Sequence, residues 1–277
     1  MEIIGRKCVN CWPPTVNDMP DTVLKKHAAA GVTLYNDDAF VVMRRILDKH
    51  PAGCFDMIFV DPPYRLSNDG FTCKNGKMAS VNKGDWDKSG GLFADAVFHE
   101  EWLRLCHALL KENGTIWVCG THHNIHLTGY LMQNVGYHVL NDIIWEKPNP
   151  PPNLSCRFFT HSAETIIWAR KSKKAKHVFN YELMRSQNGG KQMKSVWKIL
   201  PPGQQEKRFG KHPTQKPLAL LERCIMAASN AGDLIFDPFM GSGTTGVAAL
   251  RHDRQFCGCE SDNRFFKTAQ ERMGLYD

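Results

Sequence analysis

The sequence predicts an α/β fold in which a mostly parallel sheet of seven strands carries helices on both faces. Short apolar runs with the length of buried strands alternate along the chain with amphipathic segments of helical period. A turn with two glycines joins one strand to a helix, and 277 residues suffice for one large domain. The expected strands cover residues 32–35, 54–60, 115–119, 137–145, 164–169, 234–236 and 255–259. The expected helices cover about 39–49, 95–111, 123–135, 218–230, 246–251 and 262–273.

The composition is that of an ordinary globular protein, with 42% hydrophobic and 23% charged residues and a mean hydropathy of −0.39. No apolar run approaches the roughly 20 residues that span a bilayer. The first residues also lack the apolar core of a secretion signal. Ten cysteines in such a chain are expected as reduced thiols, so we expect a cytoplasmic protein. The net charge of +7 permits a polyanionic partner without requiring one.

The turn with two glycines has the residues of a ligand site. It runs Asp237-Pro-Phe-Met-Gly-Ser-Gly-Thr-Thr245, between an apolar strand and the start of a helix. Gly241 and Gly243 carry no Cβ, so the backbone can turn sharply and approach a ligand. The open N–H groups of the helix start favour anionic groups, and Asp237 can accept hydrogen bonds from an ammonium or an amide. No Gly-Lys-Ser/Thr follows, so the turn is not a P-loop, and a corner without a ligand is the plain alternative.

A second motif, Asp61-Pro-Pro-Tyr64, also follows an apolar strand and has the groups that activate an aromatic amine. Such an amine is a poor nucleophile, because its lone pair is conjugated with the ring. The Asp61 carboxylate and the Pro62 carbonyl can accept its two N–H groups and localise the lone pair on nitrogen. Pro63 stiffens the turn further, and Tyr64 offers a π face for a base taken out of its stack. Taken alone, an ordinary turn is the plain alternative for this motif.

Two further acidic residues follow expected strands. Glu260 comes 17 residues after Gly243, close to the spacing at which an acidic residue binds ribose hydroxyls. Asp38 stands between the strand at 32–35 and the helix at 39–49. It therefore either caps that helix or faces a ligand from the end of the strand.

Two groups of residues have metal-ligand character, but neither predicts a metal site. Cys8 and Cys11 lack a second pair of matching spacing, and zinc needs four ligands. His122, His123 and His126 have no evident carboxylate partner. We therefore expect no metal.

Residues 65–91 are rich in Gly, Asn, Ser, Lys and Asp. A structureless loop of roughly 25 residues in a compact domain is usually functional or disordered. Because it directly follows Tyr64, we expect a mobile lid or a loop that contacts nucleic acid. Its Gly84-Asp-Trp-Asp87 is the expected anchor.

The positive charge is concentrated between residues 171 and 211, where eleven basic side chains accompany two acidic ones and four aromatic residues. A run of charge is often only a solvated face. An excess gathered in one segment of irregular structure favours phosphate contact instead. The expected phosphate-contacting residues, with Arg157 from an earlier loop, are Arg157, Lys171, Lys173, Lys174, Lys176, Arg185, Lys191, Lys194 and Lys198.

Together the motifs resemble the S-adenosylmethionine-dependent amino-methyltransferases of DNA. Asp-Pro-Pro-Tyr precedes the glycine turn, and His212-Pro-Thr-Gln-Lys-Pro217 stands just before that turn. This order resembles the β group, a circular rearrangement of the family. The resemblance covers about residues 32–273 and implies a Rossmann-like class I methyltransferase fold. Three longer blocks resemble the second, single-strand-tolerant adenine methyltransferase of DpnII-type restriction systems, namely residues 61–70, 81–87 and 153–162.

The resemblance implies S-adenosylmethionine as the cofactor and gives roles to residues of this chain. The glycine turn would hold the methionine part, Glu260 would hold the ribose, and Asp38 would meet the adenine. The residues implied at the cofactor are Asp38, His212, Thr214, Gln215, Lys216, Asp237, Pro238, Phe239, Gly241, Ser242, Gly243, Thr244, Thr245 and Glu260. The residues implied in catalysis are Asp61, Pro62, Pro63 and Tyr64.

The residue at position 61 separates the substrate classes of the family. Relatives that modify N4 of cytosine usually have Ser there, and relatives that act on glutamine or RNA usually have Asn. Asp61 therefore implies methyl transfer to N6 of adenine in DNA after base flipping, and GATC is the implied site. The alternatives are an N4-cytosine or RNA methyltransferase and a DNA-binding relative without catalysis.

Composition and resemblance together divide the chain into four parts. These are an N-terminal arm (1–31), a catalytic half (32–170), a basic target-recognition insert (171–210) and a cofactor-binding half (211–277), the two halves forming one domain. The loops at 65–91 and 153–162 are also expected to touch DNA. The implied partners are double- or single-stranded DNA, a second copy of the chain and a cognate restriction endonuclease. No membrane association is expected.

Overall fold

The structure, a computed structural model, describes residues 31–65, 87–153, 155–210 and 212–275. It also describes the backbone of three short strands at 26–27, 71–74 and 77–80. Cys8, Cys11 and nearly all of the expected N-terminal arm lie outside the described residues.

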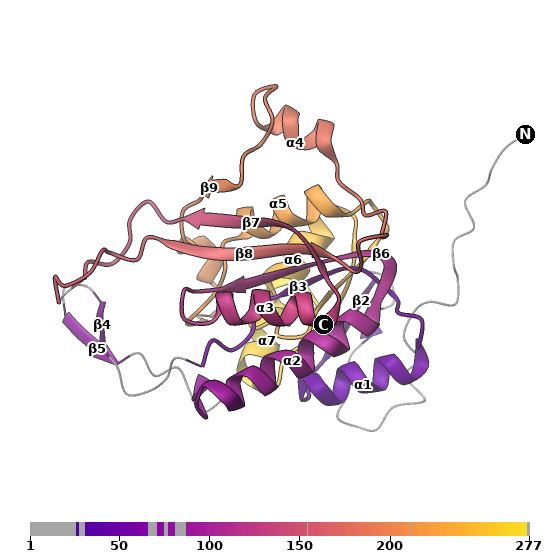
Figure 1. Cartoon of the computed structure of the whole chain (residues 1–277), viewed down its shortest axis with the longest axis horizontal. Helices are drawn as coiled ribbons and strands as arrows, with labels where there is room; N and C mark the ends of the chain where they lie inside the picture. Colours follow the sequence, from indigo (N-terminus) through magenta and orange to yellow (C-terminus); the bar gives the residue numbers. More distant parts are fainter. Residues whose placement is uncertain are drawn as a thin grey trace, which may run out of the picture.

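The described residues form an alternating series of strands and helices (Figure 1). Among these helices, none is both long and apolar enough to cross a membrane. The strands are β1 (Lys26–His27), β2 (Val32–Tyr35), β3 (Phe55–Val60), β4 (Phe71–Lys74), β5 (Lys77–Ser80), β6 (Leu110–Gly120), β7 (His138–Glu146), β8 (Ala163–Arg170), β9 (Val196–Lys198), β10 (Leu234–Asp237) and β11 (Gln255–Cys259). The helices are α1 (Ala39–Lys49), α2 (Leu92–Leu109), α3 (Ile125–Val135), α4 (Tyr181–Gln187), η3 (Gln205–Lys207), α5 (Leu218–Ala228), α6 (Thr244–Arg251) and α7 (Asn263–Arg272).

Nine of the strands form one sheet in the order β1-β2-β11-β10-β3-β6-β8-β7-β9. The seven strands expected from the sequence are its seven central strands, and the short β1 and β9 extend its two edges. The neighbours from β2 to β6 pair in parallel. Only β8, between β6 and β7, and the edge strand β1 run antiparallel to their neighbours. The mostly parallel α/β fold is confirmed.

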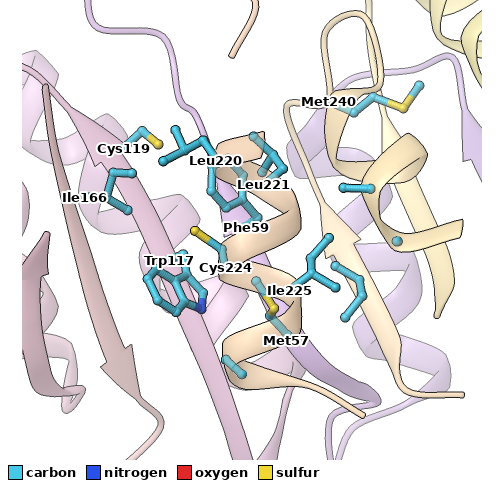
Figure 2. Packing of buried hydrophobic residues seen from close by; sticks show 14 of the residues in the cluster. Met57, Phe59, Trp117, Cys119, Ile166, Leu220, Leu221, Cys224, Ile225 and Met240 are labelled. Atoms are coloured by element: carbon cyan, nitrogen blue, oxygen red, sulfur yellow. The ribbon is translucent and has the colours of Figure 1, made fainter. Parts of the chain in front are cut away.

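Helices cover both faces of this sheet, because alternate residues of a buried strand point to opposite sides. Met57 and Phe59 of β3 join a hydrophobic cluster with α5, α6 and α7 (Figure 2). Ile58 and Val60 of the same strand join a second cluster with α1, α2 and α3. Strands that are buried on both faces are therefore apolar throughout, which is why the sequence shows them as continuous apolar runs.

The parallel pairing places three chemically important strand ends at one edge. Phe236 of β10 lies opposite Ile58 of β3, and Asp237 lies opposite Gly258 of β11. The residues that follow these strands, Asp61 and Glu260 among them, therefore leave the sheet at the same edge. In open α/β sheets this carboxyl edge is where ligands bind.

The boundary between α2 and β6 differs from the expectation. The sequence placed the end of the helix at Asn113-Gly114, but α2 already ends at Leu109 and β6 begins at the next residue. Gly114 lies inside the strand, where a Cβ would come within 3.1 Å of the Phe55 carbonyl oxygen. The glycine thus serves a close approach beside the register shift between β3 and β6, and it does not end a helix.

The stretch at 65–91 is not without secondary structure. Strands β4 and β5 pair antiparallel within it as a separate two-stranded sheet. The expected anchor is described only at Asp87, because residues 81–86 lie outside the described part. Asp87 is fully buried, and its carboxylate accepts a hydrogen bond of 2.8 Å from the Arg65 backbone N–H. This bond ties the two ends of the stretch together.

The basic segment at 171–210 is also more regular than expected. It contains α4 and β9, and β9 adds to the edge of the main sheet by pairing in parallel with β7. Trp197 of β9 and Met184 of α4 are buried in the cluster that contains α5. These two apolar anchors fasten a segment that looks polar and irregular in sequence.

Candidate active site

A cleft lies at the carboxyl edge of the sheet, where β3, β10 and β11 end. Its empty volume, open mouth included, is about 1220 Å³. Of the residues expected at the catalytic or cofactor site, all but Gly243 line this cleft. Segments that are far apart in sequence thus converge on one space.

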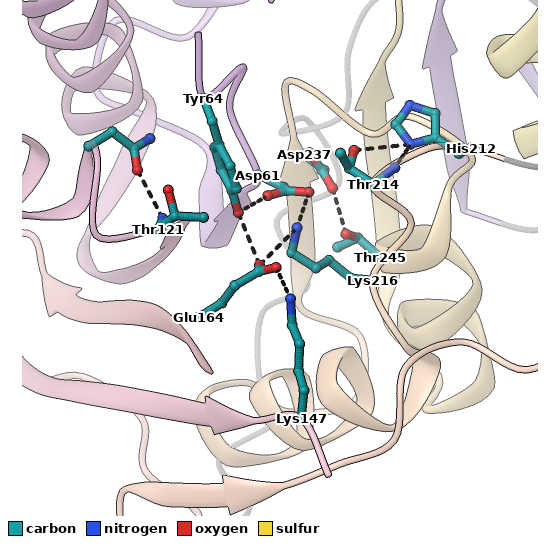
Figure 3. Close-up of polar contacts among 11 residues, drawn as sticks. Asp61, Tyr64, Thr121, Lys147, Glu164, His212, Thr214, Lys216, Asp237 and Thr245 are labelled. Carbon is teal, nitrogen blue, oxygen red and sulfur yellow. Dashed lines mark hydrogen bonds and ion pairs between the residues drawn. The ribbon is translucent and has the colours of Figure 1, made fainter. Parts of the chain in front are cut away.

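The carboxylate of Asp237 forms the floor of the cleft below the glycine turn (Figure 3). Thr245 donates a hydrogen bond of 2.5 Å to its Oδ2, and the Phe239 N–H donates one of 3.1 Å to Oδ1. Its side chain is almost completely buried. The strand therefore ends in a carboxylate that local donors hold in a fixed orientation.

Glycine is required at position 243 for two reasons. Its φ of 76° lies in the left-handed region, which L side chains rarely adopt. A Cβ at this position would also lie 2.8 Å from the Cβ of Ala269 on α7. Gly243 therefore supports the turn from behind the cleft, by letting α6 approach α7 closely.

Arg272 is a structural support of the turn that sequence reasoning missed. Its Nη1 lies 2.8 Å from the Ser242 carbonyl oxygen, 2.9 Å from the Ser242 hydroxyl and 2.8 Å from the Thr244 hydroxyl. In sequence it looks like an ordinary basic residue in the last turn of a helix. Only the packing of α7 beneath the turn reveals its role.

Glu260 accepts two backbone hydrogen bonds at the same edge. Its Oε2 lies 3.1 Å from the Gly241 nitrogen, and its Oε1 lies 2.8 Å from the Asp262 nitrogen. Asp38 lines the cleft, but its carboxylate also caps α1 by accepting from the Phe40 and Val41 N–H groups. The capping role that the sequence suggested for Asp38 is thus present, and it leaves the residue facing the cleft.

Asp237 and Glu260 form an acidic wall of the cleft. Among the described residues, no lysine or arginine forms an ion pair with either carboxylate. Burial raises the pKa of Asp237 to about 7, against the opposing hydrogen bonds from Thr245 and Phe239. Burial likewise raises the pKa of Glu260. Such a wall is suited to a ligand that brings a cationic group.

The carboxylate of Asp61 is held from two sides. The Tyr64 hydroxyl donates to its Oδ1 at 2.7 Å, and the Lys216 ammonium donates to its Oδ2 at 2.6 Å. Lys216 belongs to the segment before α5, so it lines the cleft as expected, but its ammonium is directed at Asp61. Burial, followed by the nearby Asp61 and Glu164 charges, raises the pKa of Tyr64 well above its ordinary value.

Glu164 and Lys147 complete this network, and neither was named from the sequence. The Glu164 carboxylate lies 3.5 Å from the Lys216 ammonium and also bonds the Lys147 ammonium (Figure 3). Burial would raise the pKa of Glu164, but Lys216 and Lys147 outweigh it and lower that pKa. The one available signal was a glutamate among the apolar residues of an expected strand. Only the antiparallel direction of β8 shows that this glutamate lies at the edge of the catalytic motif.

The remaining residues named for the cofactor support the cleft from the segment before α5. The Thr214 N–H and hydroxyl each lie 3.3 Å from His212 Nδ1. The His212 ring packs edge-on against Phe265 and beside Gly241. Gln215 is buried and donates to the Glu206 carbonyl oxygen at 2.9 Å.

The basic residues do not form one surface. Lys171 follows β8, and its ammonium donates to the Leu110 carbonyl at 2.6 Å, at the amino end of β6. This is the opposite edge of the sheet from Asp61, and the neighbouring Lys173, Lys174 and Lys176 follow Lys171 there. Lys198 pairs with Glu146 at the end of β7 and lies at the carboxyl edge, as the β7–β8 loop with Arg157 does.

The three histidines lie near the carboxyl edge as well, and among them only His126 lies within α3. His122 and His123 precede α3, and the His122 ring stacks on His161 with centroids 4.2 Å apart. In the described part of the chain, no three His, Cys, Asp or Glu side chains are placed to hold a metal ion.

Comparison with known proteins connects this geometry to one family. The family described as DNA methylase, which comprises N6 and N4 methyltransferases, matches residues 55–271. The chain is 53% identical to the Type II methyltransferase M2.MboI of Moraxella bovis over 217 residues, which is 78% of this chain and 80% of that protein. It is 48% identical to the Type II methyltransferase M2.DpnII of Streptococcus pneumoniae over 244 residues, covering 86% and 91% of the two chains.

Solved structures agree with the fold. The complex of M1.HpyAVI with S-adenosylmethionine superposes with a TM-score of 0.67 at 30% identity, covering 88% of this chain and 100% of that one. The cytosine-N4-specific PvuII DNA methyltransferase superposes with a TM-score of 0.68 at 19% identity, covering 89% and 86% of the two chains. The second likeness concerns the fold alone.

The cleft fits S-adenosylmethionine as its cofactor. The carboxylates of Asp237 and Glu260, which have no ion-pair partner among the described residues, suit its ammonium and its ribose hydroxyls, and the absent Cβ of Gly241 leaves room beside them. The chain therefore belongs to the DNA methylase family of N6 and N4 methyltransferases, and it is an S-adenosylmethionine-dependent DNA methyltransferase.

Proposed function

We propose that this methyltransferase transfers the methyl group to N6 of adenine in DNA and that Asp61 is its catalytic carboxylate. The observation that carries the proposal is the placement of Asp61 in the same cleft as the acidic wall of Asp237 and Glu260. A carboxylate for the target amine and a wall for the cationic cofactor thus face one space.

The chemistry follows from the groups around Asp61. When bound, S-adenosylmethionine supplies an electrophilic methyl group on a sulfur that leaves with the bonding electrons. Asp61 and the Pro62 carbonyl accept the two N–H groups of the amine, so that its lone pair is directed at the methyl carbon. As the new bond forms, the nitrogen becomes positive and must lose one proton. Asp61 is the group placed to accept it.

Tyr64 combines two roles in this proposal. Its hydroxyl fixes Asp61, while the residue as a whole is only 7% exposed and forms part of the cleft wall. The adenine therefore stacks on a rigid surface that is already bonded to the catalytic carboxylate. Because this wall lies within a cleft, a paired base cannot reach it, and the base must be flipped out of the duplex or come from a single strand.

The DNA-contacting surface is proposed at the carboxyl edge beside the cleft. The β7–β8 loop carries Arg157 and two exposed aromatic residues, Phe158 and Phe159, of which Phe159 is 96% exposed. An exposed arginine suits phosphate, and exposed rings suit stacking with unpaired bases. Exposed Lys198 extends this surface along β9. Arg185, Lys191 and Lys194, around and beyond α4, are proposed to contact DNA farther from the cleft.

The biological setting is proposed from the relatives. Their names place them among Type II methyltransferases, so a cognate restriction endonuclease that acts on the same site is the proposed partner. GATC is the proposed site, and a homodimer is the proposed assembly, both from the resemblance to enzymes of DpnII-type systems. The contacts described above do not themselves select a base sequence.

The test is methyl transfer from isotope-labelled S-adenosylmethionine to unmethylated DNA, followed by digestion to nucleosides and chromatography. Label is expected in N6-methyladenine, and label in N4-methylcytosine would overturn the proposed target atom. Asp61→Ala is expected to abolish transfer while the cofactor and DNA still bind. Duplex and single-stranded oligonucleotides with one GATC or one GTAC then test the site and the strand preference.

A further inference from the structure

We propose that Glu164, itself held by Lys147, is a positioning residue that keeps the Lys216 ammonium in place against Asp61. This inference rests on the catalytic role proposed above for Asp61. Glu164 and Lys147 lie outside the two motifs and come from β8 and from the residue after β7. They would couple the antiparallel part of the sheet to the reaction centre.

Glu164 contacts both groups that hold Asp61. Its Oε2 lies 3.3 Å from the Tyr64 hydroxyl and 3.5 Å from the Lys216 ammonium. Its side chain is 13% exposed, and it is fixed within β8 by pairing with Trp145 of β7. Figure 3 shows the side chains of Tyr64, Lys216 and Glu164 directed toward one another from separate segments. The position of Glu164 is thus set by the sheet and does not depend on the mobility of a loop.

Lys216 needs such a partner because its side chain is long and has rotational freedom. An ammonium has three donors, and Asp61 takes one of them. Glu164 offers a second acceptor on the side away from Asp61, and the Tyr64 ring lies 5.3 Å from the ammonium nitrogen. In the described structure, Asp61 and Glu164 are the carboxylates that form ion pairs with this ammonium. Without Glu164, Asp61 would therefore hold it alone. It could then turn toward the cleft.

Charge balance gives Glu164 a second effect. Asp61 and Glu164 carry two negative charges, and Lys216 and Lys147 carry two positive charges, so the buried group is neutral as a whole. The reaction brings a cationic methyl donor and creates positive charge on the amine beside this group. An unbalanced positive charge in a site shielded from water would oppose both.

The test compares wild type with E164Q, K147M and the double variant E164Q/K147M. Single-turnover rates are measured at saturating DNA and S-adenosylmethionine, and cofactor affinity is measured separately by calorimetry. Removing a group that stabilises charge directly lowers the rate by roughly 100- to 1000-fold. Glu164 acts through Lys216, so we expect the single-turnover rate of E164Q to fall by roughly 10- to 100-fold. Cofactor affinity is expected to stay close to that of wild type. The double variant restores neutrality and is expected to react faster than E164Q.

Each outcome decides a different point. An E164Q rate equal to wild type, with Asp61→Ala inactive, overturns the inference and leaves the proposed function intact. A double variant no faster than E164Q overturns the charge-balance effect. Activity retained by Asp61→Ala overturns the proposed function itself. If E164Q fails to fold, as judged by cofactor binding and thermal unfolding, E164D replaces it. Its shorter side chain cannot reach both partners, so an unchanged rate in E164D overturns the inference.

Discussion

The Lys216 ammonium lies 2.6 Å from Oδ2 of Asp61, although the two residues are 155 positions apart in the chain. This ion pair joins the two motifs that the sequence shows separately. Asp61 follows β3 and Lys216 precedes α5, so the pair links two distant segments that both line the cleft. Both side chains are largely buried, at 17% and 6% exposure. Contacts of this kind contribute to stability as well as to chemistry.

Removing the lysine should therefore destabilise the protein. Lys216→Met leaves Asp61 and Glu164 buried beside one another, with Lys147 as their one remaining ion-pair partner in the described part of the chain. Breaking a buried pair from one side typically costs about 3–5 kcal/mol, and we expect the free energy of unfolding in urea to fall by that amount. Burial disfavours the charged lysine, but Asp61 and Glu164 outweigh it and raise its pKa. The lysine is therefore charged throughout the pH range in which unfolding is measured.

Lys198→Met is the matched control for this prediction. Lys198 also pairs with a glutamate, Glu146, but at 3.5 Å and with 66% of its side chain exposed. Exposed pairs contribute about 0–1 kcal/mol, so the control should unfold nearly as wild type does. Equal losses of unfolding free energy in the two variants would show that the buried pair contributes no more than the exposed pair.

Much of the site could be predicted because it lies in contiguous residues at strand ends. Buried parallel strands are apolar on both faces, so β3 and β10 are visible in sequence, and Asp61 and Asp237 stand immediately at or after their ends. A parallel sheet brings such ends to one edge, which is why both motifs line one cleft. The same rule also placed Glu260 correctly at the end of β11.

The parts that could not be predicted depend on tertiary contacts between isolated residues. Arg272 supports the glycine turn from α7, and Glu164 supports Lys216 from β8, yet each is a single charged residue in an ordinary element. The edge strand β9 has three residues, too few for a periodic pattern. The direction of β8 also matters, because an antiparallel strand sends the chain after Arg170 to the edge away from the cleft. Charge counting alone cannot show that reversal.

The binding of the cofactor should depend on pH through Asp237. Its pKa of about 7, against the ordinary 3.8, means that the carboxylate gains its charge only near neutral pH. An ammonium binds the charged form, so affinity for S-adenosylmethionine should rise as pH increases through about 7. Below that pKa the affinity should fall by up to about tenfold per pH unit. Calorimetric titration of the cofactor between pH 6 and pH 8.5 measures the effect.

The control is Asp237→Asn, which should bind more weakly and lose this part of the pH dependence. The difference between the two proteins removes the cofactor's own titration. Stability of the free protein should change in the opposite sense. Because the folded-state pKa of Asp237 is raised, the native protein holds a proton that the unfolded chain releases. The stability that this proton contributes is lost as pH rises from about 4 to about 7. Parallel pH profiles in the two proteins would contradict the assignment.

The glycine turn should tolerate no side chain at position 243. Gly243→Ala incurs the cost of a left-handed backbone, about 1–2 kcal/mol, and also forces a Cβ against Ala269. Overpacking of this kind typically costs about 1–3 kcal/mol more. Gly274→Ala is the control, because Gly274 has a similar φ of 70° but nothing within 4 Å of its absent Cβ. The free energy of unfolding in urea should fall more for Gly243→Ala than for Gly274→Ala. Only Gly243→Ala should also bind the cofactor more weakly.

Basic residues at the two edges of the sheet are expected to differ in their contribution to DNA binding. Arg157 lies on the β7–β8 loop beside the cleft, whereas Lys173 and Lys174 follow β8 at the far edge, next to Lys171 and the start of β6. Each phosphate contact contributes about 0.9 to the slope of log affinity against log salt on duplex DNA. Arg157→Ala should therefore weaken binding and lower that slope by about one unit. The double variant Lys173→Ala/Lys174→Ala removes more charge, yet it should leave the slope nearly unchanged.

Fluorescence anisotropy over a range of salt concentrations measures both variants on the same duplex. A larger slope change in the lysine variant would mean that DNA reaches the far edge, and the basic segment would then be a contact surface along its whole length.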